Sequence, residues 1–207
     1  MSRIVSDREL NRATLARQML QRRQAVDAVT AVGRLCALQA QAPASPYLAL
    51  WTRLQDFDPA ELDAAFDRGT VVKTTLMRST LHAVTAADHP DFWSAHEEHL
   101  WRTRPGTPQV AALGATEEQL TEAVRLALAH AVDTPRSNAE LTAHLLDAVG
   151  PVDDPGWWWA VRGFTRVVRV PDESVWRFGP RLIFRSAQTP VPVGTPEQSL
   201  RALVRAG

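Results

Sequence analysis

The chain has 207 residues, enough for one large domain or for two of about 100 residues that each bury a core of their own. With 45% apolar residues, a mean hydropathy of -0.19 and no run of the ~18 apolar residues that a membrane-spanning helix needs, we expect a cytoplasmic globular protein with no membrane partner. The single cysteine, Cys36, excludes an intrachain disulfide and a thiolate-rich zinc site.

Charge is balanced overall, with 23 basic and 23 acidic residues, which argues against binding nucleic acid through a high net charge. The distribution is uneven. Residues 1–36 hold seven Arg against three acids, residues 56–133 hold six basic against thirteen acidic, and residues 157–190 hold six Arg against two acids. A locally positive face can therefore still attract phosphate. Lys73 is the only lysine.

The N-terminal part of the chain is predicted to be helical. Ser6 and Glu9 have the spacing of a capping box, which predicts a helix from Asp7 to about Arg23. The inward face of this helix would carry four apolar residues, Leu10, Leu15, Met19 and Leu20. Apolar residues at helical spacing predict a second helix over about 25–38.

The predicted second helix runs into Gln39-Ala40-Gln41, and Pro43 follows two residues later. Because a proline disfavours helical geometry at the residue before it, the helix is expected to end near the glutamines. Residues two apart share a face in extended backbone, so both amides can converge on one point. Such a pair suits a held water molecule, provided that the leaving group is already activated. The alternative interpretation is a solvated surface.

Two more helices and a hairpin complete a first predicted module. A third helix starts near Ala44, and a fourth is predicted over 59–68 because Asp58 is a good N-cap. Alternating and β-branched residues over 71–84 predict the strands of a hairpin. Helices followed by a short hairpin are typical of a winged helix-turn-helix, here over residues 1–103.

A helix over about 87–101 and a connector with Pro and Gly over 104–114 precede a second module, predicted over 115–190. Its helices are expected at 116–131, at 137–149 and from 157 onward, and its hairpin would pair 175–178 with 182–186 about Gly179-Pro180. Residues 195–207 are expected to begin a third module that the chain does not complete.

The third helix of the second module would carry Arg162, Arg166 and Arg169 on one face, at spacings of four and three. The third helix of a winged-helix module usually lies in a DNA groove, so these arginines are expected to contact DNA. The alternative is a basic face that is merely solvated. Residues 157–159, all tryptophan, are interpreted as core, with stacking on an unpaired base as the alternative.

The chain resembles the AlkZ/YcaQ-like family of DNA glycosylases in three regions. These are the block "RLCALQAQAPASPYLALWTRL", the block "VVKTTLMRSTLHAVTAAD" and the second predicted winged helix. The hallmarks of that family are Gln-x-Gln after Arg-Leu-x-x-Leu, here Gln39-Ala40-Gln41, and an Arg-x-Thr-Leu-His strand, here residues 78–82. The resemblance implies a fold that is mainly α with short β-hairpins (α+β), built from tandem winged helices, of which the family has three.

The resemblance also implies a function. Members excise N-alkylated purines from double-stranded DNA as monofunctional glycosylases and unhook interstrand crosslinks such as those made by azinomycin-type agents. Gln39 and Gln41 would hold the water that attacks the anomeric carbon, and Gln at the second position places the chain in the amide branch rather than the Asp branch. No metal or organic cofactor is implied, and a monomer is expected.

DNA contacts are expected from polar and basic residues of both predicted modules: Arg78, Thr80, His82, Arg162, Arg166, Arg169, Arg181 and Arg185. For residues 78, 80 and 82, which would alternate on one strand face, packing under the first module is the alternative. His96 and His99 could suggest a metal, although exposed polar residues of an amphipathic helix explain them better.

Two other classes of function compete with a glycosylase. A non-catalytic DNA-binding protein, such as a transcription regulator, would use the Arg162 helix and leave the glutamines dispensable. A scaffold whose winged helices bind protein is the third possibility, which the uneven charge disfavours.

Overall fold

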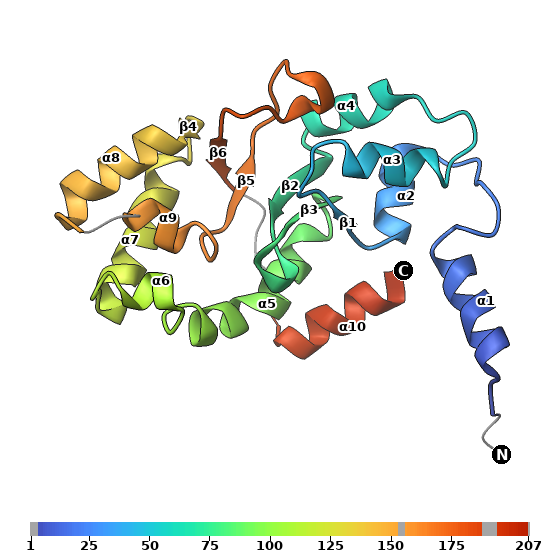
Figure 1. Ribbon diagram of the computed structural model, residues 1–207, viewed down its shortest axis with the longest axis horizontal. Coiled ribbons are helices and arrows are strands. Elements are labelled where there is room, and N and C mark those ends of the chain that lie inside the picture. The colour runs from blue at the N-terminus through green and yellow to red at the C-terminus, as the bar shows by residue number, and fades with distance from the viewer. Residues whose placement is uncertain (1–3, 153–155, 188–193, 207) are drawn as a thin grey trace.

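The computed structural model describes residues 4–152, 156–187 and 194–206, and the structural statements below concern these residues (Figure 1). The helices are α1 (Asp7–Arg17), α2 (Ala28–Arg34), α3 (Ser45–Trp51), α4 (Pro59–Asp67), α5 (His89–Thr103), α6 (Pro108–Ala111), α7 (Glu117–His130), α8 (Asn138–Val149), α9 (Trp157–Val161) and α10 (Pro196–Ala206). The strands are β1 (Leu38–Gln39), β2 (Val71–Thr75), β3 (Leu81–Thr85), β4 (Arg136–Ser137), β5 (Val167–Arg169) and β6 (Ile183–Ser186), with 3-10 turns η1 (Met77–Ser79) and η2 (Val175–Arg177). The predicted α+β class is confirmed.

Helix starts follow the local sequence closely. Ser6, Thr116 and Ser137 each begin a helix through a reciprocal capping box, in which the cap side chain accepts the N–H of the third helical residue and that residue's side chain accepts the cap N–H. Asp58 caps α4, and its side chain accepts the N–H of Ala60. These starts are where the sequence predicts them.

The first helix differs from its prediction. It ends at Arg17 rather than near Arg23, and it buries none of its residues. Leu10 is 61% exposed, and Leu15 and Leu20 are also exposed, whereas Met19, beyond the helix, is buried. The predicted inward face of this helix is therefore wrong for three of its four residues. Figure 1 shows the reason, because α1 extends away from the rest of the chain.

The second helix is also shorter than predicted, and this places the glutamines outside it. Cys36 has a φ of 65°, a left-handed backbone that ends the helical geometry after α2. The chain then turns into β1, so Gln39 lies in a strand and the N–H of Ala40 donates to the carbonyl of Leu81 on β3.

One antiparallel sheet joins elements from both halves of the chain, in the order β1-β3-β2-β5-β6-β4. The predicted hairpin of β2 and β3 pairs with the β5–β6 hairpin through β2 and β5 (Figure 1). At this seam the buried Thr74 Oγ1 donates a hydrogen bond of 2.7 Å to the carbonyl of Val167. The division into modules 1–103, 115–190 and 195–207 stays a prediction.

The second hairpin does not use the predicted first strand. Its strand is β5, whereas residues 175–177 form the turn η2, in which Trp176 and Arg177 have positive φ angles. The carboxylate of Asp172 accepts N–H groups from Ser174 and Gly179, which closes this segment into a compact loop. Local side-chain bonds therefore replace strand pairing here.

Two apolar clusters flank the sheet. The cluster that includes Leu50, Leu62 and Phe66 lies under the N-terminal helices. The other holds residues from α5, α7, α8 and α9 and reaches Leu203 of α10, which lies beside α5 (Figure 1). Among the described residues, no helix has both the length and the apolar character needed to span a bilayer.

Candidate functional site

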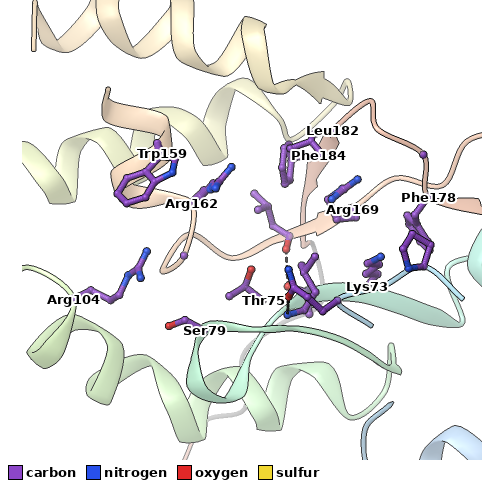
Figure 2. Close-up of a pocket in the computed structure, with 17 residues that line it drawn as sticks. Lys73, Thr75, Ser79, Arg104, Trp159, Arg162, Arg169, Phe178, Leu182 and Phe184 are labelled. Atoms are coloured by element: carbon purple, nitrogen blue, oxygen red, sulfur yellow. Dashed lines mark hydrogen bonds between the residues drawn. The ribbon is translucent and has the colours of Figure 1, made fainter. Parts of the chain in front are cut away.

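A cavity of about 590 Å³ lies at the seam between β2 and β5 (Figure 2). Strands β2, β5 and β6 contribute to its wall, as do the segments that follow α5 and α9. Four of the lining residues are cations, Lys73, Arg104, Arg162 and Arg169, whereas no Asp or Glu of the described residues lines it. The cavity is therefore strongly positive although the chain as a whole is neutral.

Aromatic rings, rather than carboxylates, lie against these cations. The distances from the charged group to the ring centroid are 4.6 Å for Lys73 over Phe178, 5.5 Å for Arg169 over Phe184 and 6.0 Å for Arg162 over Trp159. In the described part of the chain, none of the four cations forms an ion pair, although the field of Asp172 reaches Arg169. Ring faces stabilise a cation weakly and leave its hydrogen bonds unused.

Burial raises the free energy of these charges. Lys73 is only 2% exposed, and burial together with the nearby Arg169 lowers its pKa to about 8. Burial also lowers the pKa of Arg104, Arg162 and Arg169. The Nε atoms of Arg104 and Arg169 are buried and have no hydrogen-bond partner within the described ranges. A bound anion would supply the missing charge and acceptors together.

A glycine makes room for one of these arginines. A Cβ added to Gly163 would lie 2.9 Å from the Cζ of Arg104, closer than real Cβ contacts. Figure 2 shows Arg104 and Arg162 approaching the cavity from different segments of the chain. The absence of a side chain at residue 163 therefore lets two guanidinium groups share one wall of the cavity.

The two predicted catalytic glutamines are both exposed, but they differ in position. Gln41 lines the cavity, and its Oε1 accepts the N–H of Leu81 at 3.2 Å. Gln39 is not among the lining residues, and its cross-strand partner is His82. The structure thus brings Gln41, rather than the whole pair, to the cavity.

The expected contact strand does not present its residues on one face. Arg78 lies in the turn η1 with a φ of 57°, so it does not alternate with its neighbours in a strand, and that part of the prediction is wrong. Thr80 donates to the carbonyl of Met77, and the Nδ1 of His82 lies 3.0 Å from the carbonyl of Thr80. Burial lowers the pKa of His82.

The predicted arginine stripe on one helix is also wrong. The helix α9 ends at Val161, so Arg162 lies at its C-cap, Arg166 in the following segment and Arg169 on β5. Arg162 and Arg169 reach the cavity, whereas Arg166 lies in the electrostatic field of Glu97 on α5. After the helix, Phe164 is buried in the core and the chain enters β5 at Val167.

The remaining predicted contacts lie on the surface outside the cavity. Arg181 is exposed in the loop before β6, and Arg185 is exposed on β6. Sequence reasoning did not assign Lys73 or Arg104 to the site, although the presence of a single lysine was a usable signal. Of the three adjacent tryptophans, two are buried, and the third, Trp159, lines the cavity.

The described residues offer no obvious metal site. Within them, no three His, Cys, Asp or Glu side chains gather closely enough to hold an ion. His96 and His99 lie with their ring centroids 5.7 Å apart, without an acidic third member.

Comparisons with known proteins give both a family and a fold. A family model described as DNA glycosylase AlkZ-like matches residues 32–206. Among solved structures, the Streptomyces sahachiroi DNA glycosylase AlkZ is similar, with a TM-score of 0.72 and 20% sequence identity over 93% of this chain and 53% of that protein. The chain thus spans about half the length of that protein, and at this identity the likeness shows the fold. No curated protein sequence matches significantly.

Proposed function

Since the chain belongs to the AlkZ-like family of DNA glycosylases, we propose that it hydrolyses the N-glycosidic bond of N7- or N3-alkylated purines in double-stranded DNA. The site of this reaction is the cationic cavity at the β2–β5 seam. The protein acts as a monomer in the cytoplasm, and the reaction needs water but no cofactor.

The observation that carries this proposal is the uncompensated charge of the cavity. Four cations without carboxylate partners in the described chain fit a polyanion, and each phosphate bound there releases counterions from the DNA. The planar fork of Arg104 or Arg169 can contact two oxygens of one phosphate. This arrangement favours a DNA backbone over a neutral ligand.

The proposed chemistry needs little acid catalysis. An N7-alkylated purine carries positive charge, so its bond to the sugar is weakened before the enzyme acts. Gln41, with Gln39 two residues earlier, would orient a water molecule toward the anomeric carbon, and the amide oxygens would stabilise the developing oxocarbenium charge. The same cleavage at a crosslinked N7 would unhook the crosslink. Of the two amides, Gln41 is the better placed, because it lines the cavity.

The test is release of 7-methylguanine from alkylated duplex DNA under single-turnover conditions. Gln41→Ala should lower the rate by about 100-fold and Gln39→Ala by less, since removing one positioned amide that stabilises a transition state costs about 10²–10³. Gln55→Ala, in an exposed loop, is the matched control.

Two outcomes would each contradict one part of the proposal, either the activity or the role of the glutamines. Tight DNA binding without base release would favour a non-catalytic DNA-binding protein. Release that is unchanged in both variants would remove the glutamines from the mechanism while leaving the glycosylase activity in place.

A further inference from the structure

Lys73 is the one primary amine that a side chain can supply, because the sequence has no other lysine. It lies on β2, lines the cavity and is 2% exposed. Its Nζ is 4.6 Å from the ring centroid of Phe178 (Figure 2). The amine is therefore buried against an aromatic ring within the proposed reaction site.

The surroundings of Lys73 disfavour its charged form. Its cross-strand partner on β5 is Arg169, a second cation, and no carboxylate of the described residues pairs with it. Burial and this neighbour lower the pKa of Lys73 to about 8, so about a tenth of the amine is neutral at pH 7. A desolvated lysine beside another cation is a recurrent way to make an amine nucleophilic.

The other three cations of the cavity cannot take this role. Arginine stays protonated at any ordinary pH, so Arg104, Arg162 and Arg169 can bind phosphate but not attack carbon. The cavity thus combines three fixed cations with one amine that can lose its proton. This division of roles fits a reaction in which phosphate is held while the amine forms a bond.

We propose that Lys73 forms a Schiff base with the aldehyde of an abasic site in DNA and cleaves the strand by β-elimination. This activity rests on the proposed function, since base removal generates the abasic sugar, and it goes beyond the purely hydrolytic activity that the family resemblance implies. The ligand class is an open-chain 2-deoxyribose aldehyde between two phosphates.

The reaction needs no co-reactant other than water. The neutral Nζ adds to C1′ of the aldehyde, and loss of water gives the protonated imine. The C2′ proton then passes to water, the C3′–O bond breaks, and the 3′ phosphate leaves with that electron pair, beside the cavity arginines. Water finally hydrolyses the imine, which releases Lys73 and leaves an unsaturated aldehyde on the cut strand.

The test uses the full chain and a duplex with a preformed abasic site, in the presence of sodium borohydride, which reduces an imine to a stable amine. Proteolysis and mass spectrometry should place the adduct on the peptide that contains Lys73. Lys73→Arg, which keeps the charge but cannot form the imine, should reduce the adduct per bound duplex at least 50-fold.

The result that overturns the inference is the absence of an adduct on Lys73 in the wild-type chain, whether or not the duplex binds. An adduct that persists in Lys73→Arg overturns it too, because it would come from the N-terminal amine. Because the abasic site is preformed, trapping needs no base release. Trapping without 7-methylguanine release would refute only the proposed glycosylase function, and release without trapping would refute only the role of Lys73.

Discussion

The two faces of the central sheet differ in the charged side chains that they carry and in the groups that surround them. One face carries the cross-strand neighbours Lys73 and Arg169, whose charges have no ion-pair partner in the described chain. On the other face, His82 lies against the carbonyl of Thr80, and Arg166 lies in the field of Glu97 on α5. The cations that line the cavity therefore gather on the first face, where the described chain offers Arg169 the field of Asp172 but no ion pair. Buried charge that the fold does not pair is therefore the strongest sign of function here.

The largest expected effect is a charge reversal on the cavity face. Arg169→Glu should weaken duplex DNA binding by at least 100-fold, because it removes a cation and places a carboxylate beside the phosphates. Arg185→Glu, on an exposed part of β6, makes the same change of charge and should weaken duplex DNA binding by less than 10-fold. Equal losses in a binding titration at fixed salt would show that the two faces do not differ.

The next effect concerns stability on the α5 side of the sheet. His89 is 1% exposed, and burial, followed by the nearby Arg166, lowers its pKa from 6.5 to about 4. Between these values the unfolded chain binds the proton and the folded chain does not, so stability falls as pH falls. From pH 6.5 to 5 the free energy of unfolding should drop by roughly 1 to 2 kcal/mol through this group. Denaturant titrations at several pH values should show this decrease in the wild type but not in His89→Gln. An equal decrease in both proteins would refute the prediction.

A smaller effect is expected from filling the space beside Arg104. Gly163→Ala should displace the guanidinium group and weaken DNA binding about 5-fold, while the free energy of unfolding changes little because the displaced group is flexible. Gly106→Ala is the matched control, since its added Cβ would lie 3.9 Å from the nearest atom. A large loss of stability in Gly163→Ala would mean that Arg104 is held rigidly.

The smallest effect separates two arginines by face. The logarithm of the DNA binding constant should fall linearly with the logarithm of salt concentration, and Arg162→Ala should reduce that slope by about 0.9, as expected for one lost phosphate contact. Arg166→Ala should leave the slope unchanged, because its guanidinium lies in the field of Glu97. Identical slopes for both variants would contradict the prediction that only Arg162 contacts the DNA.

Local signals predicted much of the secondary structure, whereas long-range pairing set the site. The starts of α1, α7 and α8 depend on neighbouring residues, and they lie where the sequence predicts them. The length of α9 was not predicted correctly, since a helical spacing of arginines says nothing about the buried Phe164 that follows. Propensity can start a helix, but tertiary packing decides where it ends.

The candidate site was only partly predictable for the same reason. The glutamine motif places Gln41 just after β1, and Gln41 lines the cavity. The cavity itself depends on the pairing of β2 with β5, which are more than ninety residues apart, and no local pattern announces that contact. Lys73 and Arg104 therefore became candidates only once the sheet was assembled.

The most direct test of the central claim, that the cationic cavity is where the damaged nucleotide is processed, is 7-methylguanine release by two double variants that each remove two positive charges. Arg104→Ala with Arg169→Ala removes them from the cavity, and Arg68→Ala with Arg102→Ala removes them from exposed positions. We expect the first pair to lower single-turnover release by more than 100-fold and the second by less than 3-fold. Equal losses, or a greater loss from the second pair, would contradict the account.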